Sequence, residues 1–340
     1  MHPFSYERPK SAAQAVSAAS RHTLAGKAPP SSPAQFIAGG TNMTDYMKLG
    51  VMQPDRLIDI NRMQDAGLDN IVVSDQGIRF GALVRMAEAE EHPAIKSRYP
   101  VIAESLQLAA SGQIRNMASL SGNILQRTRC EYFREISWSC NKRRPGSGCA
   151  AMEGFNRQHA VLGGSEDCIA TYHGDFAQSL IALDASVDIL GPNGPRHLPF
   201  SRLHRRPGKT PEIETDLAPD ELVVAIHVPA LSWAKRSHYL KIRDRQSYAF
   251  ALASAAVVLD LEGDTVRDAR IALGGVATVP WRSKEAEDAL RNRTLDETAA
   301  EEAAVAAFAD ARPSKHNAFK VELGRRTLVR ALFETRDMKV

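Results

Sequence analysis

The 340-residue chain lacks several features that would assign it to common protein classes. No apolar run reaches the roughly 18 residues that a membrane-spanning helix needs, so we expect no membrane insertion. The N-terminus has no basic start followed by an apolar segment, so we expect no signal peptide. Positive charge forms no wide stripe with interleaved aromatic residues, which argues against a nucleic-acid surface.

Familiar site motifs are also absent. The sequence contains no close C-x-x-C pair, which zinc sites usually have, and neither the G-x-G-x-x-G fingerprint nor a P-loop. What is present is ordinary for a soluble globular protein, with 44% apolar and 24% charged residues. At this length two or three domains with a sizeable core are expected.

Cysteine is scarce, but its distribution is not random. All four cysteines, Cys130, Cys140, Cys149 and Cys168, are separated by only 10, 9 and 19 positions, so we expect them to act together. Disulfides are disfavoured in a long chain without a signal peptide. Four widely spaced thiolates on a loop favour an iron–sulfur cluster, while a zinc clip and inert buried thiols are the alternatives.

The cysteine stretch is also basic. Between Gln126 and Arg157 seven basic residues stand against three acidic ones, a net charge of +4, whereas the whole chain carries +3. Nearby cations would offset the negative charge of a thiolate-bound cluster and raise its potential. The Pro-Gly-Ser-Gly turn at 145–148 would let backbone N–H groups approach a sulfur atom.

A second pattern lies near the N-terminus, where a short apolar strand at 35–38 leads into Gly39-Gly40-Thr41-Asn42 and then into a helical segment. Such glycines let successive backbone N–H groups face one anion, and a helix N-terminus adds a favourable dipole. The pattern suits a pyrophosphate, although a Gly-Gly turn after a strand is more often only a turn.

Hydrophobic periodicity predicts a mixture of strands and helices. Strands are expected at 4–6, 56–60, 71–73, 77–80, 186–190, 221–228, 239–243, 249–259 and 265–273, and helices at 12–19, 43–49, 86–91, 101–110, 176–183, 284–290, 299–309 and 319–333. Three strands followed by three helices after residue 237 suggest a separate α+β domain. The polar, proline-rich stretch 204–219 is expected to be a linker or exposed loop.

Three further positions have two interpretations each. The segment Ser111–Ile124 is either a surface strand with two turns or a donor-rich ligand segment. Asp175 fits the N-cap of the helix at 176–183, and an aspartate before a helix also accepts from a ribose hydroxyl in dinucleotide sites. Lys241, inside a strand, either faces solvent or turns towards a bound anion.

Together these stretches resemble the FAD-binding medium subunit of the molybdenum hydroxylases, the xanthine dehydrogenase and aldehyde oxidoreductase family. The resemblance covers essentially the whole chain. It is carried by FIAGGTN at 36–42, IRNMASLSGNI at 114–124, CIATYHGD at 168–175 and the run CNKRRPGSGCAA at 140–151. The cysteine insertion is similar to that of the FAD subunit of bacterial periplasmic-type aldehyde oxidoreductases, which carries an extra [4Fe–4S] cluster.

The resemblance implies an α+β fold with a two-subdomain FAD-binding domain of the vanillyl-alcohol-oxidase/PCMH type at 1–229. Its subdomains would be 1–60 and 61–229, with the iron–sulfur loop at about 126–168. A C-terminal α+β domain at 237–340 would contain a three-stranded antiparallel sheet and helices.

The resemblance also implies site residues. Positions 36–43 would cradle the FAD phosphates, Ser119 and Asn123 would bind the pyrophosphate or ribose, and Asp175 the ribose or adenine end. Ala109 and Val223 would lie against the cofactor, and Lys241 would reach the flavin. The complete set of expected FAD contacts is Phe36, Ile37, Ala38, Gly39, Gly40, Thr41, Asn42, Met43, Ala109, Ser119, Asn123, Asp175, Val223 and Lys241. The four cysteines would hold the [4Fe–4S] cluster. His173-Gly174 stands where the family usually has Pro-Ser.

As function, the resemblance implies an electron-transfer subunit with no catalytic residue of its own. Its partners would be a small subunit with [2Fe–2S] clusters and a large molybdenum cofactor subunit that oxidises an aldehyde, and electrons would leave to an external acceptor. The rival hypotheses are a zinc-clipped non-redox protein and a stand-alone flavin oxidase of the same fold. The expected compartment is the cytoplasm, or the periplasm if a partner subunit carries the export signal.

Overall fold

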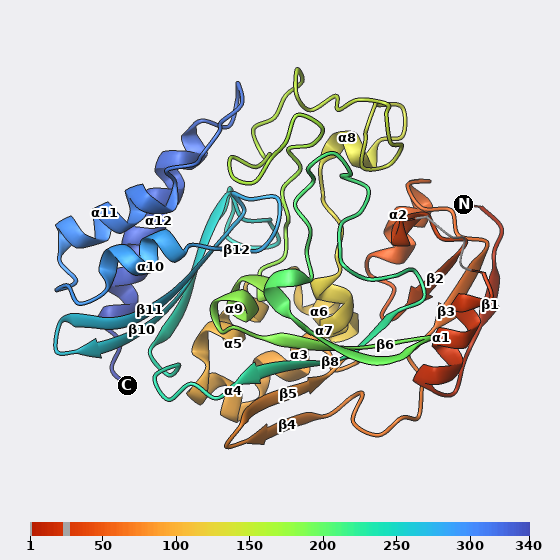
Figure 1. The fold of residues 1–340 in the computed structure, drawn as a ribbon, viewed down its shortest axis with the longest axis horizontal. Coiled ribbons are helices and arrows are strands. Elements are labelled where there is room, and N and C mark those ends of the chain that lie inside the picture. The colour runs from red at the N-terminus through yellow and green to blue at the C-terminus, as the bar shows by residue number, and fades with distance from the viewer. Residues whose placement is uncertain (1, 23–27) are drawn as a thin grey trace.

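The computed structural model describes residues 2–22 and 28–340, which form three sheets and the helices that cover them (Figure 1). The expected mixed α+β class is confirmed. In the described residues no helix combines the length and apolar character needed to cross a membrane.

The N-terminal part is a small parallel sheet. Its strands β1 (Ser5–Glu7), β3 (Arg56–Asp59) and β2 (Ala34–Ile37) lie in the order β1-β3-β2. Around it stand α1 (Ala12–Ser20), the 3-10 turn η1 (Pro29–Ser31) and α2 (Met43–Lys48). Helix α1 begins where the Ser11 side chain accepts from the Gln14 N–H, and its alanine-rich face packs on Ile58.

The central part is an antiparallel sheet in the order β4-β5-β8-β6-β7. The strands are β4 (Ile71–Ser74), β5 (Gly77–Gly81), β6 (Ser186–Gly191), β7 (Gly194–Pro199) and β8 (Leu222–Pro229). The helices beside it are α3 (Met86–Glu91), α4 (Pro93–Arg98), α5 (Pro100–Gln107), α6 (Gly112–Met117), α7 (Leu120–Ile124), α9 (Phe176–Ala182) and the 3-10 turn η2 (Phe200–Arg202).

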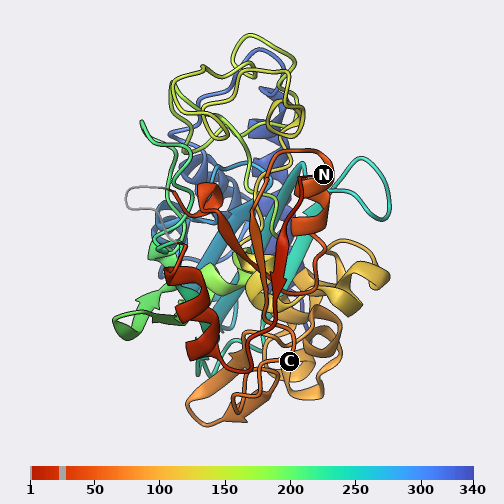
Figure 2. The same ribbon diagram turned by 90° about the vertical axis from the view of Figure 1, so that its right-hand side faces the viewer.

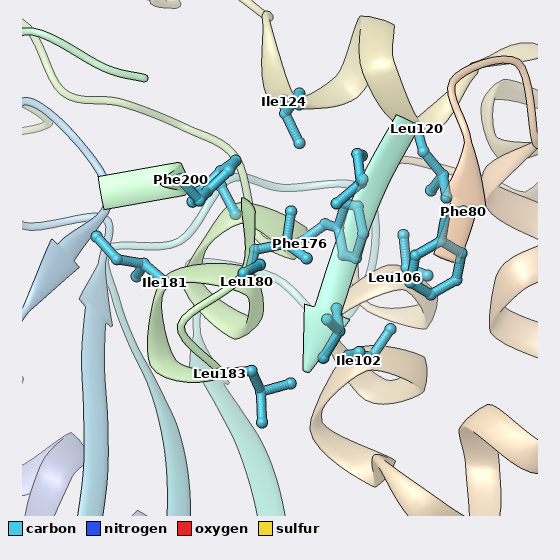
Figure 3. Packing of buried hydrophobic residues seen from close by; sticks show 14 of the residues in the cluster. Phe80, Ile102, Leu106, Leu120, Ile124, Phe176, Leu180, Ile181, Leu183 and Phe200 are labelled. Carbon is cyan, nitrogen blue, oxygen red and sulfur yellow. The ribbon is translucent and has the colours of Figure 1, made fainter. Parts of the chain in front are cut away.

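The largest core lies between this sheet and its helices (Figure 3). Phe80 from β5 and Phe176 from α9 are fully buried and meet edge to face, with ring centroids 6.1 Å apart. Ile102 and Leu106 on α5 fill the space beside them. Fully burying a side chain of this size contributes about 1.5–3 kcal/mol, so this core holds the first residue of α9 in place.

The C-terminal part is an antiparallel sheet with helices on one face. The three expected strands are confirmed as β9 (Ser237–Ile242), β10 (Ala253–Glu262) and β11 (Thr265–Gly274), and the two-residue strand β12 (Trp281–Arg282) extends the edge next to β11. Helices α10 (Lys284–Leu290), α11 (Glu297–Ala307) and α12 (Phe319–Arg336) bury their apolar faces against it (Figure 1).

The cysteine loop, defined here as residues 126–168, extends away from the sheets at the top of Figures 1 and 2. Its regular structure is the four-residue helix α8 (Glu131–Arg134), with isolated bridges that pair Cys140 with Cys149 and Ser165 with Cys168. It nevertheless contributes to a small core that it shares with Tyr46 and Met52, in which Phe133 is fully buried next to three of the cysteines.

One local expectation is wrong. The segment Ser111–Ile124 forms two short helices, α6 and α7, and no surface strand. The reason lies in its serines, because Ser111 accepts from the Ile114 N–H and Ser119 from the Gly122 N–H. Small polar residues that read as strand and turn are therefore helix N-caps.

Candidate functional site

Two adjoining cavities lie between the N-terminal part, the central part and loops of the C-terminal part at 244–250 and 278–279. The first is lined by the glycine turn, by α7 and by the loops at 125–128 and 204–219. The second, about 860 Å³, lies on the side of the C-terminal part and of the cysteine loop. Both are lined by Thr41, Asn42 and Ala118, so they adjoin at these residues, and together they are called the cleft.

The glycine turn connects β2 to α2 at the floor of this cleft. A Cβ atom on Gly39 would lie 1.8 Å from the carbonyl oxygen of Met117, and Gly40 has a φ of +76°, so both positions require glycine. Within residues 2–22 and 28–340, the backbone N–H groups of Gly39, Gly40 and Thr41 donate to no protein acceptor. Unpaired N–H groups at a cleft fit the phosphate oxygens of a dinucleotide.

Helix α7 lies opposite the glycine turn. Ser119 is buried as its N-cap, while Asn123 donates through Nδ2 to Met86 Sδ at 3.4 Å. The Asn123 Oδ1 atom is buried and has no partner among the described residues. A buried acceptor without a donor is costly, so this oxygen is suited to an N–H or O–H group of a ligand.

Asp175 occupies the N-cap position of α9, as expected, but its side chain makes no capping hydrogen bond. Both carboxylate oxygens instead bind groups of β9. Oδ1 accepts from the Tyr239 hydroxyl at 2.7 Å and Oδ2 from Lys241 Nζ at 2.8 Å. Asp175 is 5% exposed and lines the second cavity.

Lys241 is the expected FAD contact that lines neither cavity. It does not face solvent, since its side chain is 1% exposed. Besides Asp175, its ammonium group donates to the Leu108 carbonyl oxygen at 2.9 Å. The anion towards which this lysine turns is therefore a carboxylate of the protein itself.

The other expected FAD contacts all line the cleft. Those at the first cavity are Phe36, Ile37, Ala38, Gly39, Gly40, Thr41, Asn42, Met43, Ser119 and Val223. The second cavity adds Ala109, Asn123 and Asp175. The structure thus brings together segments that are up to 187 positions apart in the chain, from Phe36 to Val223.

Sequence reasoning missed the polar groups of the stretch 204–219 that line the first cavity. His204 donates from Nε2 to the Ile124 carbonyl oxygen at 2.8 Å, and burial lowers its pKa to about 4. Glu214 binds Arg127 at 2.5 Å and Lys142 at 3.0 Å. Burial alone would raise the pKa of Glu214, but the two cations outweigh it and lower that pKa. This stretch is a loop, as expected, yet part of it is buried.

The four cysteines converge at the far side of the cleft. All are free thiols; Cys130, Cys140 and Cys168 are buried, and Cys149 is half-buried. Burial raises the pKa of Cys130 to about 12 and that of Cys168 to about 11. Among the residues that the structure describes, no three Cys, His, Asp or Glu side chains are arranged to hold a single metal ion.

The positive charge of the cysteine loop is mostly internal. Arg134 pairs with Asp45, and Arg157 pairs with Asp244 of the C-terminal part. Arg143 donates to four backbone carbonyl groups of its own loop, those of Tyr132, Phe133, Ile136 and Trp138. Most of the loop's basic side chains therefore bind groups of the protein itself. Lys142 also acts on Cys168, because its positive charge opposes the effect of burial and lowers the pKa of that thiol.

Comparison with known proteins covers nearly all of the chain. Residues 2–231 match the family model described as the FAD binding domain in molybdopterin dehydrogenase. Residues 238–335 match the CO dehydrogenase flavoprotein C-terminal domain. The chain is 45% identical to the aldehyde oxidoreductase FAD-binding subunit PaoB of Escherichia coli (strain K12), over 99% of each chain.

More distant relatives agree. The carbon monoxide dehydrogenase medium chain of Hydrogenophaga pseudoflava is 28% identical, over 92% of this chain and 88% of that one. A solved structure of carbon monoxide dehydrogenase from the same organism superimposes with a TM-score of 0.73 at 27% identity, covering 97% of this chain and 96% of its own. The chain belongs to the FAD-binding medium subunits of the molybdenum hydroxylase family, and is a component of an oxidoreductase.

Proposed function

We propose that this chain is the FAD- and [4Fe–4S]-binding electron-transfer subunit of a heterotrimeric molybdenum-containing aldehyde oxidoreductase. A small [2Fe–2S] subunit supplies its electrons, a large molybdenum cofactor subunit oxidises the aldehyde, and an external acceptor takes the electrons from this chain. The observation that carries the proposal is the 45% identity to an aldehyde oxidoreductase FAD-binding subunit over 99% of both chains.

The cleft fits FAD by the chemistry of its free groups. Bound FAD would supply the electron-accepting ring, and the chain's task is to bind and orient it. The unpaired N–H groups of Gly39, Gly40 and Thr41 are donors for the phosphates. Asn123 Oδ1 offers an acceptor for a hydroxyl or amide donor. Val223 and Ala109 offer apolar surface in the two cavities.

The four cysteines fit an iron–sulfur cluster as donors. Metal ligation requires thiolates, and buried thiols with raised pKa values lose their protons readily only when a cation replaces them. Four free thiols in one loop are the ligand set that a [4Fe–4S] cube takes, whereas zinc sites usually use close C-x-x-C pairs, which this sequence lacks.

The cluster's role is structural in this proposal. The cysteine loop has one four-residue helix and a small core, so cross-linking four of its positions would hold it in place. Oxidation of the aldehyde and reduction of the flavin would then proceed through the partner subunits without this cluster.

The experiment is to purify the chain with its co-expressed partners and to determine FAD, iron, acid-labile sulfide and zinc. An aldehyde added without oxygen should bleach the flavin absorption of the complex but not that of the isolated chain. A colourless protein with one zinc per chain would support the zinc-clipped alternative. Aldehyde turnover by the chain alone would support the stand-alone oxidase.

A further inference from the structure

We infer that Tyr239, a residue of the C-terminal part, is a positioning residue that orients the Asp175 carboxylate towards the flavin cofactor. The inference deepens the proposed function, since it rests on FAD occupying the cleft. It concerns a residue that lines neither cavity and so would act only through Asp175.

Tyr239 lies in β9 two positions before Lys241, so both side chains leave the strand on the same face. Across this face, β10 places Ser254 directly opposite Lys241. The Tyr239 side chain is 1% exposed, and its hydroxyl lies 2.7 Å from Asp175 Oδ1 and 2.9 Å from Ser254 Oγ. Strand β9 of the C-terminal part therefore binds the residue that directly precedes α9 of the central part.

The direction of these hydrogen bonds follows from the proton count. A carboxylate only accepts, so the single Tyr239 proton goes to Asp175, and the Ser254 hydroxyl donates to the tyrosine oxygen. This chain of donors fixes the rotation of the carboxylate. Hydrogen bonds to a charged acceptor are also among the stronger ones in proteins.

The arrangement leaves part of Asp175 free. Each carboxylate oxygen has room for about two donors, and Tyr239 and Lys241 supply one to each. Asp175 lines the 860 Å³ cavity, so the remaining acceptor positions are available to a ligand there. Because the buried donors Tyr239 and Lys241 already fix the orientation of this carboxylate, less entropy is lost when a ligand binds to it.

The test is the FAD affinity of the full-length apoprotein, measured by flavin fluorescence for the wild type, Tyr239→Phe, Asp175→Asn and the double variant. Tyr239→Phe removes one hydroxyl and leaves the charge of Asp175 paired with Lys241, so the fold is preserved. We expect it to weaken FAD binding about tenfold. In the Asp175→Asn background the same change should have an effect of less than about twofold, because the two residues act as one unit.

A matched control is Tyr99→Phe. Tyr99 is as buried as Tyr239, at 1% exposure, but its hydroxyl bonds the Pro229 carbonyl oxygen at 3.3 Å, away from the cleft. Both variants should lower the melting temperature to a similar extent, yet only Tyr239→Phe should change FAD affinity and the visible circular dichroism of the bound flavin. That spectrum reports a fixed flavin orientation, which a general loss of stability does not alter.

Three results would overturn the inference: FAD affinity of Tyr239→Phe within twofold of the wild type, equal effects of Tyr239→Phe with and without Asp175, or equal losses for the two tyrosines. A wild-type chain that bound no FAD would instead contradict the proposed function itself. The two failures are therefore distinguishable in one series of titrations.

Discussion

The flavin cleft and the cysteine loop are built in different ways. The cleft lies where regular elements end, and a core of fully buried side chains holds those ends. The cysteine loop has little regular structure, and side chains such as Arg143 replace it by binding backbone carbonyl groups. The cleft is therefore formed by packing alone, whereas the loop depends on side-chain bonds to its own backbone, to which the proposed cluster would add further links.

The cysteine loop is also bound differently to the C-terminal part and to the cleft. The loop is tied to the C-terminal part by the buried side chains of Asn156, Asn317 and Lys320, which bond backbone groups across the boundary. It is tied to the cleft by ion pairs and by Arg129, which donates to Asn42 and Tyr46. Substitutions in the cysteine loop should therefore lower the stability of the protein more than they lower its FAD affinity.

The largest expected effect comes from Gly39→Ala in the cleft. The new Cβ would meet the Met117 carbonyl oxygen at 1.8 Å, and a backbone group cannot swing aside, so the turn must move. We expect FAD affinity to fall more than about 100-fold, with a stability loss of about 1–3 kcal/mol typical of overpacking. Isothermal titration with FAD and urea unfolding measure both.

Gly112→Ala is the matched control, because a Cβ there has no atom within 4 Å. It should retain FAD affinity within about twofold. Equal FAD affinities of Gly39→Ala and the wild type would show that the turn is not a phosphate site.

Next in size is Cys149→Ser in the loop. If the cluster is structural, this change should lower its iron and sulfide content and reduce the melting temperature by about 5 °C or more. Flavin reduction by aldehyde in the assembled complex should stay normal. A variant that keeps its melting temperature but no longer reduces flavin would place the cluster in the electron path.

A smaller effect is expected for Arg143→Met, which removes the donors to the carbonyl oxygens of Tyr132 and Phe133 at 2.9 and 2.6 Å. We expect a loss of about 2 kcal/mol in the free energy of unfolding, the usual range for hydrogen bonds to a charged group. Arg144→Met, at the exposed neighbour, should change it by less than about 0.5 kcal/mol. Similar free energies of unfolding for the two variants would show that the bonds from Arg143 to the loop backbone do not stabilise the fold.

Per pH unit, the smallest effect concerns Lys320, which donates to the carbonyl oxygens of Gln158 and Gly275 at 3.0 and 2.7 Å. Burial is the main cause that lowers its pKa from 10.5 to about 7. Between these values the unfolded chain holds a proton that the folded chain lacks, so stability rises with pH. The gain is at most about 1.4 kcal/mol per pH unit.

Lys320→Met tests this sign directly. Its unfolding free energy, measured by urea titration from pH 7 to pH 10, should lack the rise seen in the wild type. Parallel pH profiles for the two proteins would mean that Lys320 keeps its ordinary pKa in the fold.

The sequence predicts more of the cleft than of the loop, for physical reasons. Periodicity and turn residues are local signals, so the strand before Gly39 and the helix after Asp175 could be placed from neighbouring residues alone. The crowding of the cysteines was equally visible. In contrast, the bonds from Tyr239 and Lys241 to Asp175 span 64 and 66 positions, and no local pattern reports them.

Two positions show what a local pattern leaves open. Asp175 has the expected N-cap position but uses its carboxylate on a distant strand, and Ser111–Ile124 forms helices where a surface strand was one interpretation. Side chains that cap, bond a distant partner or face solvent look alike in sequence. The loop's arginines show the same ambiguity. Their net charge suggested compensation of a cluster, but their guanidinium groups bind carboxylates and carbonyls of the chain.

The most direct test of the account is the cofactor content of the native complex, purified without oxygen and analysed for FAD, iron, sulfide and zinc. We predict one FAD on this chain and, beyond the iron of the partner subunits, about four iron atoms and four sulfides that disappear together in Cys149→Ser. One zinc in place of that iron, or an iron content unchanged by the substitution, would contradict it.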